Sequence, residues 1–93
     1  MTFEESRELV IQVLTEIQTG SGRLSPEIHG DLCPIGGFEG FDSLNAVEAA
    51  SLLSEYLDCT IKPNLMLSSY PGRQLTINEI AGRLQETIGS QGG

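Results

Sequence analysis

The chain has 93 residues, and its thirteen acidic side chains against five basic ones give a net charge of −8. This length suits a single domain over residues 1–93 with one modest core. The acidity argues against nucleic-acid binding, because a phosphate backbone needs clustered Lys and Arg. No apolar run approaches the roughly 20 residues that span a bilayer, and no signal peptide is visible, so we expect a soluble, cytoplasmic protein.

The first predicted helix runs from about Phe3 to Gln18. Thr2 and Glu5 have the spacing of a capping box, in which each side chain bonds to the backbone of the other residue. Apolar residues at helical intervals predict the buried face: Leu9, Val10, Val13, Leu14 and Ile17. Gln18 falls on the polar side of this pattern. Glycines at positions 20 and 22 end the helix.

A long connection over residues 19–42 is rich in glycine and contains two prolines. A connection of this length inside a small domain is usually functional or contains short turns of its own. We expect its apolar residues to anchor it on the core: Leu24, Ile28, Leu32, Ile35 and Phe38. His29, the only histidine, has polar and glycine neighbours and is interpreted as a surface residue.

The second predicted helix covers residues 43–57, with Asp42 as its N-cap. Its spacing defines a buried stripe of Ala46, Ala49, Ala50, Leu53 and Leu57. The opposite face points to solvent and contains Ser43, Val47, Glu48, Ser51 and Glu55. A serine at the first position of such a helix is held in place and open to solvent.

The last third of the chain predicts one more long helix. Residues 59–63 are expected to be extended before a proline, residues 65–67 to form one helical turn over the core, and residues 68–74 to form a turn. A second capping box, Thr76 with Glu79, starts a helix that buries Ile77, Ile80, Ala81, Leu84 and Ile88. Residues 89–93 are expected to fray. The fold class is therefore all-α, a small three-to-four-helix bundle with a long first loop.

Catalytic and metal chemistry find little support in the sequence. Ser43 would need a base to act as a nucleophile, and His29, in a loop that does not fix its position, is the only candidate. We therefore expect a protein that is not an enzyme and that has no metal site. Cys33 and Cys59 lack the close spacing of metal ligands, and we interpret them as free thiols, with a disulfide as the alternative.

The stretch from Gly40 to Ile61 resembles the phosphopantetheine-attachment helix of acyl carrier proteins. The resemblance is carried by the Asp42-Ser43-Leu44 triplet, the Val47-Glu48 pair, and Glu55, Leu57-Asp58 and Ile61, all at the family's spacing without a gap. It implies the acyl-carrier type of bundle and a covalent phosphopantetheine on Ser43, attached by a phosphopantetheinyl transferase. The thiol of that arm, rather than a cysteine of this chain, would hold an acyl group as a thioester.

The resemblance also implies a binding surface for partner enzymes. Asp42 and Leu44 flank the attachment point, and the family's docking face falls on Leu44, Val47, Glu48, Ser51 and Glu55. The partners implied are acyl-transferring or acyl-activating enzymes with basic docking patches, in fatty-acid, lipid or polyketide-type synthesis. A basic partner also suits the absence of Lys and Arg between Leu24 and Ile61. We expect a monomer.

Three features depart from the family pattern. Asn45 and Ser54 stand where carriers of fatty-acid synthesis often have acidic residues, which predicts specialised partners. Ala49 and Ala50 on the buried stripe either leave room for a chain to enter the bundle or let the helices pack closer. The turn at 68–74 is longer and less acidic than is common there. Two alternatives stay open, a peptidyl or aminoacyl carrier and an unmodified helical interaction module in which Asp42 and Ser43 only start a helix.

Overall fold

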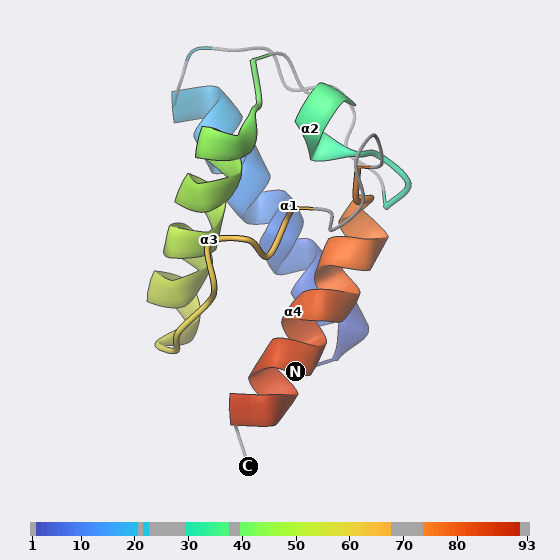
Figure 1. The fold of residues 1–93 in the computed structure, drawn as a ribbon, viewed down its shortest axis with the longest axis vertical. Coiled ribbons are helices and arrows are strands. Elements are labelled where there is room, and N and C mark those ends of the chain that lie inside the picture. Colours follow the sequence, from blue (N-terminus) through green and yellow to red (C-terminus); the bar gives the residue numbers. More distant parts are fainter. Residues whose placement is uncertain (1, 21, 23–29, 38–39, 68–73, 92–93) are drawn as a thin grey trace.

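The computed structural model describes residues 2–20, 22, 30–37, 40–67 and 74–91. It contains helices α1 (Phe3–Gly20), α2 (Pro34–Gly37), α3 (Ser43–Leu57) and α4 (Ile77–Gln91), and the described residues form no strand. The all-α class and the small helical bundle are thus as predicted (Figure 1). The bounds of α3 agree with the sequence prediction at both ends.

Helix α1 starts at the predicted capping box. The backbone N–H of Thr2 donates to Glu5 Oε1 over 2.9 Å, and the N–H of Glu5 donates to Thr2 Oγ1 over 3.2 Å. The helix continues two residues beyond its predicted end at Gln18. The prediction that Gln18 lies on the polar side is wrong, because its side chain is fully buried.

The burial of Gln18 follows from its place on a ridge of α1. Ser6, Val10, Leu14 and Gln18 are spaced four residues apart, and residues four apart lie on one face of a helix. All four are completely buried. A prediction based on apolar residues alone does not identify the burial of the two polar residues, Ser6 and Gln18, at the ends of the ridge.

The core lies where α1 packs against both α3 and α4 (Figure 1). Helix α3 contributes the predicted residues Ala46, Ala49, Ala50 and Leu53, whereas Leu57 is only partly buried. Helix α4 contributes Ile77, Ile80, Ala81 and Leu84, with Ile88 partly buried. The core among the described residues is therefore mostly aliphatic.

The segment from Asp58 to Leu67 crosses between α3 and α4 (Figure 1). It buries Ile61, Leu65 and Met66 in the core. Its backbone bonds join residues three apart, Leu65 N–H to the Lys62 carbonyl and Leu67 N–H to the Asn64 carbonyl, so the chain forms consecutive turns. The predicted helical turn at 65–67 is thus wrong in conformation but correct in covering the core.

The connection between α1 and α3 docks on the start of α4. The backbone N–H groups of Ile77 and Asn78 donate to the carbonyls of Leu32 and Gly30, each over 2.9 Å. These bonds satisfy donors that a helix N-terminus leaves free. The capping box of Thr76 and Glu79 is present as predicted, with distances of 3.0 and 3.2 Å.

Within the same connection, residues 34–37 form the short helix α2, which the sequence did not predict as a helix. Leu32 and Ile35 are partly buried against the core, as the prediction of anchoring residues requires. The other predicted anchors, Leu24, Ile28 and Phe38, lie outside the described residues, as do His29 and residues 68–73.

The end of α4 corrects one further prediction. The helix extends through Gln91, so the fraying expected from residue 89 is wrong up to that point. Cys33 and Cys59 are both free thiols, as predicted. Among the described helices, none combines the length and the apolar character that crossing a membrane requires.

Candidate functional site

The site begins where the long connection enters α3. Gly40 has a φ of +68°, a left-handed conformation that residues with a side chain rarely adopt. Phe41 follows and is buried in the core, only 4% exposed. The turn at Gly40 and the anchor at Phe41 thus fix the direction in which the chain reaches the helix.

Asp42 is the N-cap of α3, as predicted, with extended backbone angles. Its Oδ1 accepts the N–H of Leu44 over 3.0 Å and the N–H of Asn45 over 3.2 Å. In return, Asn45 Oδ1 accepts the N–H of Asp42 over 3.3 Å. Asp42 and Asn45 therefore each accept a backbone N–H of the other, and together they stabilise the first turn of α3.

Ser43 is the first residue of α3 and is exposed. Its hydroxyl forms no hydrogen bond within the part of the chain that the structure describes. The two bonds from Asp42 hold the backbone on which Ser43 sits. The result is an accessible hydroxyl on a backbone held firmly in place.

The five residues predicted to form a docking face lie on the exposed side of α3. We call Leu44, Val47, Glu48, Ser51 and Glu55 the outer face of α3, and all five are exposed. Leu44 is 78% exposed and Val47 is 41% exposed, so two large apolar side chains meet solvent beside Ser43. An apolar pair next to carboxylates is suited to a partner with an apolar centre and a basic rim.

Asn45 and Ser54, which stand where carriers of fatty-acid synthesis often have acidic residues, both have structural roles in α3. Asn45 closes the capping box with Asp42. Ser54 is partly buried; its hydroxyl donates to the Ala50 carbonyl over 3.1 Å and accepts the N–H of Ile61 over 3.0 Å. Its carbonyl also accepts the N–H groups of Asp58 and Cys59. Ser54 therefore organises the end of α3 and does not belong to the outer face.

Tyr56 is a residue that sequence reasoning missed. It is 49% exposed, and its hydroxyl donates to both carboxylate oxygens of Glu16, at 2.7 and 2.8 Å, which ties α3 to α1. The hydrogen bond to Glu16 raises the pKa of the Tyr56 phenol above its ordinary value. No local motif marks this contact, because its two residues are forty positions apart.

Within the described residues, no three His, Cys, Asp or Glu side chains gather as metal ligands would. The candidate site therefore consists of Ser43, its capping residues Asp42 and Asn45, and the outer face of α3.

Comparison of the chain with family models, with curated proteins and with solved structures found no match.

Proposed function

We propose that this chain is an acyl carrier protein in which Ser43 accepts a phosphopantetheine arm. The observation that carries the proposal is the exposed Ser43 hydroxyl, which forms no hydrogen bond among the described residues, at the first position of a doubly capped helix. An enzyme that modifies a protein must be able to reach the hydroxyl, and a backbone already held in one conformation lowers the entropy cost of binding. Ser43 offers both.

The residues around Ser43 are compatible with a covalent arm. Asp42 points its carboxylate at the backbone N–H groups of Leu44 and Asn45, so it supports the helix start without bonding to the Ser43 hydroxyl. When attached, phosphopantetheine supplies a terminal thiol that carries an acyl group as a thioester. In this proposal the chain itself catalyses nothing and presents the arm to partner enzymes.

The outer face of α3 supports the second part of the proposal, the docking of basic partners. Leu44 and Val47 supply an exposed apolar centre, and Glu48 and Glu55 supply carboxylates on the same face. Carboxylates at a rim act mainly on the rate of association and on partner choice, whereas a large apolar side chain contributes contact energy. Leu44 is the residue on which we expect binding to depend most.

The test is incubation of the protein with coenzyme A and a broad-specificity phosphopantetheinyl transferase, followed by intact-mass measurement. We expect a mass gain of one phosphopantetheine group, absent in Ser43→Ala and retained in Ser51→Ala, which removes an exposed hydroxyl from the same helix. No mass gain, with a transferase active on another carrier, overturns the proposal.

The docking face is tested through the rate of the same reaction. Leu44→Ala and Glu48→Gln should raise the transferase KM, while Glu8→Gln, which removes an exposed carboxylate from α1, should leave it unchanged. Loading the modified protein with fatty-acyl and aminoacyl activating enzymes then distinguishes an acyl carrier from a peptidyl or aminoacyl carrier. Equal effects of Glu48→Gln and Glu8→Gln would show that only net charge matters.

The capping box favours one other candidate, an unmodified helical interaction module. Asp42 and Asn45 already have a structural purpose at the start of α3, which accounts for them without any modification. Under this alternative, Ser43→Ala costs about 1 kcal/mol of stability or less and leaves biological activity intact. Under the carrier proposal, the same variant loses activity with its fold preserved.

A further inference from the structure

A second feature lies away from Ser43, in a cleft between α4 and the segment that follows α3. The cleft has a volume of about 410 Å³ and is lined by Thr60, Lys62, Asn64, Leu65, Arg83, Glu86 and Thr87. No residue of α3 lines it, and Ala49 and Ala50 are buried in the core instead. Its volume is in the range of pockets that hold small organic molecules.

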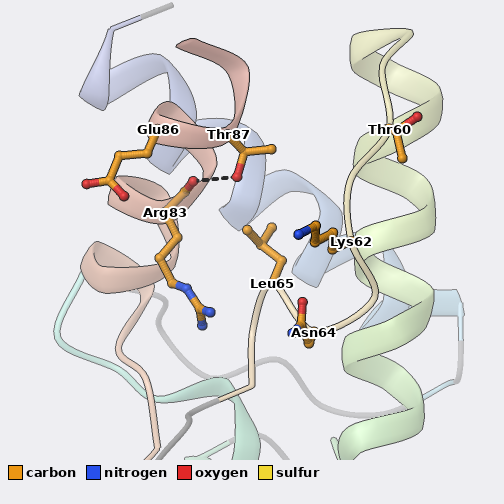
Figure 2. Close-up of a pocket in the computed structure, with 7 residues that line it drawn as sticks. All are labelled: Thr60, Lys62, Asn64, Leu65, Arg83, Glu86 and Thr87. Carbon is orange, nitrogen blue, oxygen red and sulfur yellow. Dashed lines mark hydrogen bonds between the residues drawn. The ribbon is translucent and has the colours of Figure 1, made fainter. Parts of the chain in front are cut away.

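The charge of this cleft is opposite to that of the chain. Lys62 and Arg83 are two of the five basic residues, and among the described residues that line the cleft the only acid is Glu86. Figure 2 shows Lys62 directed across the cleft toward α4, whereas the Glu86 carboxylate points away from Lys62. A local positive charge within a chain of net charge −8 creates a site that attracts anions.

Neither basic side chain has its charge neutralised by an acid among the described residues. Arg83 uses one Nη1–H to donate to the Leu67 carbonyl over 2.7 Å, which orients the guanidinium and leaves its remaining donors available. Lys62 is exposed and contributes three N–H donors on a flexible stem. Because Lys62 and Arg83 both line the cleft and both keep free N–H donors, they are suited to charge-assisted hydrogen bonds with an oxyanion.

The remaining lining residues define what else a ligand would contact. Leu65 is buried, only 5% exposed, and places an apolar side chain between α4 and Lys62 (Figure 2). The side-chain amide of Asn64 adds neutral donors beside Lys62. The Thr87 hydroxyl already donates to the Arg83 carbonyl over 2.9 Å, so it can only accept a further bond.

We propose that this cleft binds a small organic anion, whose carboxylate or phosphate group lies between Lys62 and Arg83 and whose apolar part contacts Leu65. The proposal does not depend on Ser43 or its modification. Thr60 follows the C-terminal end of α3, and Ser43 is at the other end of that 15-residue helix, about 21 Å away along its axis.

Titration followed by amide chemical shifts in ¹H–¹⁵N spectra tests the proposal. Inorganic phosphate and butyrate serve as separate probes, at constant ionic strength with chloride as the reference anion. We expect saturable shifts confined to amides of residues 60–65 and 83–87. Saturation by one probe alone identifies the oxyanion that the cleft prefers, and the apolar tail predicts tighter binding of butyrate than of acetate.

Variants separate the cleft from general charge effects. Lys62→Gln and Arg83→Gln should each weaken binding about tenfold, the size of one lost charge-assisted bond. Arg7→Gln, which removes the same charge from α1, should change binding less than twofold. The Arg83 variant also loses its bond to Leu67, so Lys62→Gln is the decisive one.

Two results would overturn the proposal. One is the absence of saturable shifts with both phosphate and butyrate. The other is equal weakening by Lys62→Gln and Arg7→Gln, which would assign the effect to net charge. Modification of Ser43 is measured in the same variants and should stay unchanged, so this proposal and the carrier proposal succeed or fail separately.

Discussion

Asp42 and Asn45 each accept a backbone N–H of the other at the start of α3. This pairing predicts that Asp42→Ala lowers the free energy of unfolding by about 1 kcal/mol, because two N–H groups of the first turn lose their acceptor. Asp42→Ser should retain most of that stability, since serine is an equally good N-cap. Urea denaturation of the three proteins measures the differences.

The same substitutions separate the two roles proposed for Asp42. If the residue is only a cap, Asp42→Ser should accept phosphopantetheine at the wild-type rate. If its carboxylate also contributes to recognition by the transferase, Asp42→Ser should be stable and modified slowly. An Asp42→Ala protein as stable as wild type would contradict the capping role.

Ser54→Ala tests the second structural residue of α3. The variant leaves the N–H of Ile61 without its acceptor in a partly buried position, so we expect a loss of about 1–3 kcal/mol in the free energy of unfolding. The matched control is Ser51→Ala on the exposed side of the same helix, which should change stability by less than about 0.5 kcal/mol. If the two substitutions change stability equally, the Ser54 hydroxyl does not specifically stabilise the end of α3.

Residues 43–57 show why much of the fold was predictable from the sequence. Their apolar residues repeat at helical spacing and Asp42 provides a local start signal, so both the helix and its exposed face follow from short-range patterns. The same spacing predicts the exposure of Ser43, Val47, Glu48, Ser51 and Glu55, whereas Leu44 was assigned to the docking face only through the resemblance to acyl carrier proteins. Contacts between residues that are far apart in the sequence could not be predicted from such patterns.

Gln18, Ser54 and Tyr56 illustrate these limits. Each is polar, so a pattern based on apolar residues assigns it to the surface or gives it no role. Gln18 is buried by its position on a ridge of α1, and Tyr56 bonds to Glu16 of a different helix. The cleft at Lys62 and Arg83 was missed for the same reason, because its two cations come together only when the segment after α3 packs against α4.

The close approach of Gly30 to the Asn78 side chain predicts that substitutions at these two positions affect stability in a non-additive way. A Cβ added at Gly30 would overlap the Asn78 side-chain amide, with its Cγ at 2.6 Å, so Gly30→Ala forces that amide to move. Because Asn78 N–H donates to the Gly30 carbonyl, the strain acts where the connection docks on α4. We expect Gly30→Ala to cost about 1–3 kcal/mol, the typical cost of overpacking.

The double variant Gly30→Ala/Asn78→Ala provides the check on this mechanism. Removing the Asn78 amide relieves the overlap, so the two substitutions together should cost less than the sum of their separate effects. Gly82→Ala is the control, since a Cβ there meets no atom within 4 Å and alanine favours the helix by up to about 1 kcal/mol. Strict additivity of the Gly30 and Asn78 effects would contradict the predicted overlap.

The hydrogen bond between Tyr56 and Glu16 predicts a loss of stability at alkaline pH. The hydrogen bond to Glu16 favours the protonated phenol, and the nearby carboxylate disfavours the phenolate, so the pKa of Tyr56 is above its ordinary value of 10.0. Since the folded-state pKa is raised, the contribution of this contact to stability is complete below pH 10 and is lost as the pH rises through the folded-state pKa. The wild-type protein should therefore lose this contribution only in strongly alkaline solution.

Ultraviolet titration of tyrosinate measures this pKa directly. Tyr70→Phe leaves Tyr56 as the only tyrosine, and in that background Glu16→Gln should move the pKa of Tyr56 back toward 10.0, because the carboxylate that holds the phenolic proton is gone. Glu8→Gln, which removes another exposed carboxylate of α1, should leave it in place. If both variants shift the pKa equally, the cause is the net charge of the protein and not the contact between Tyr56 and Glu16.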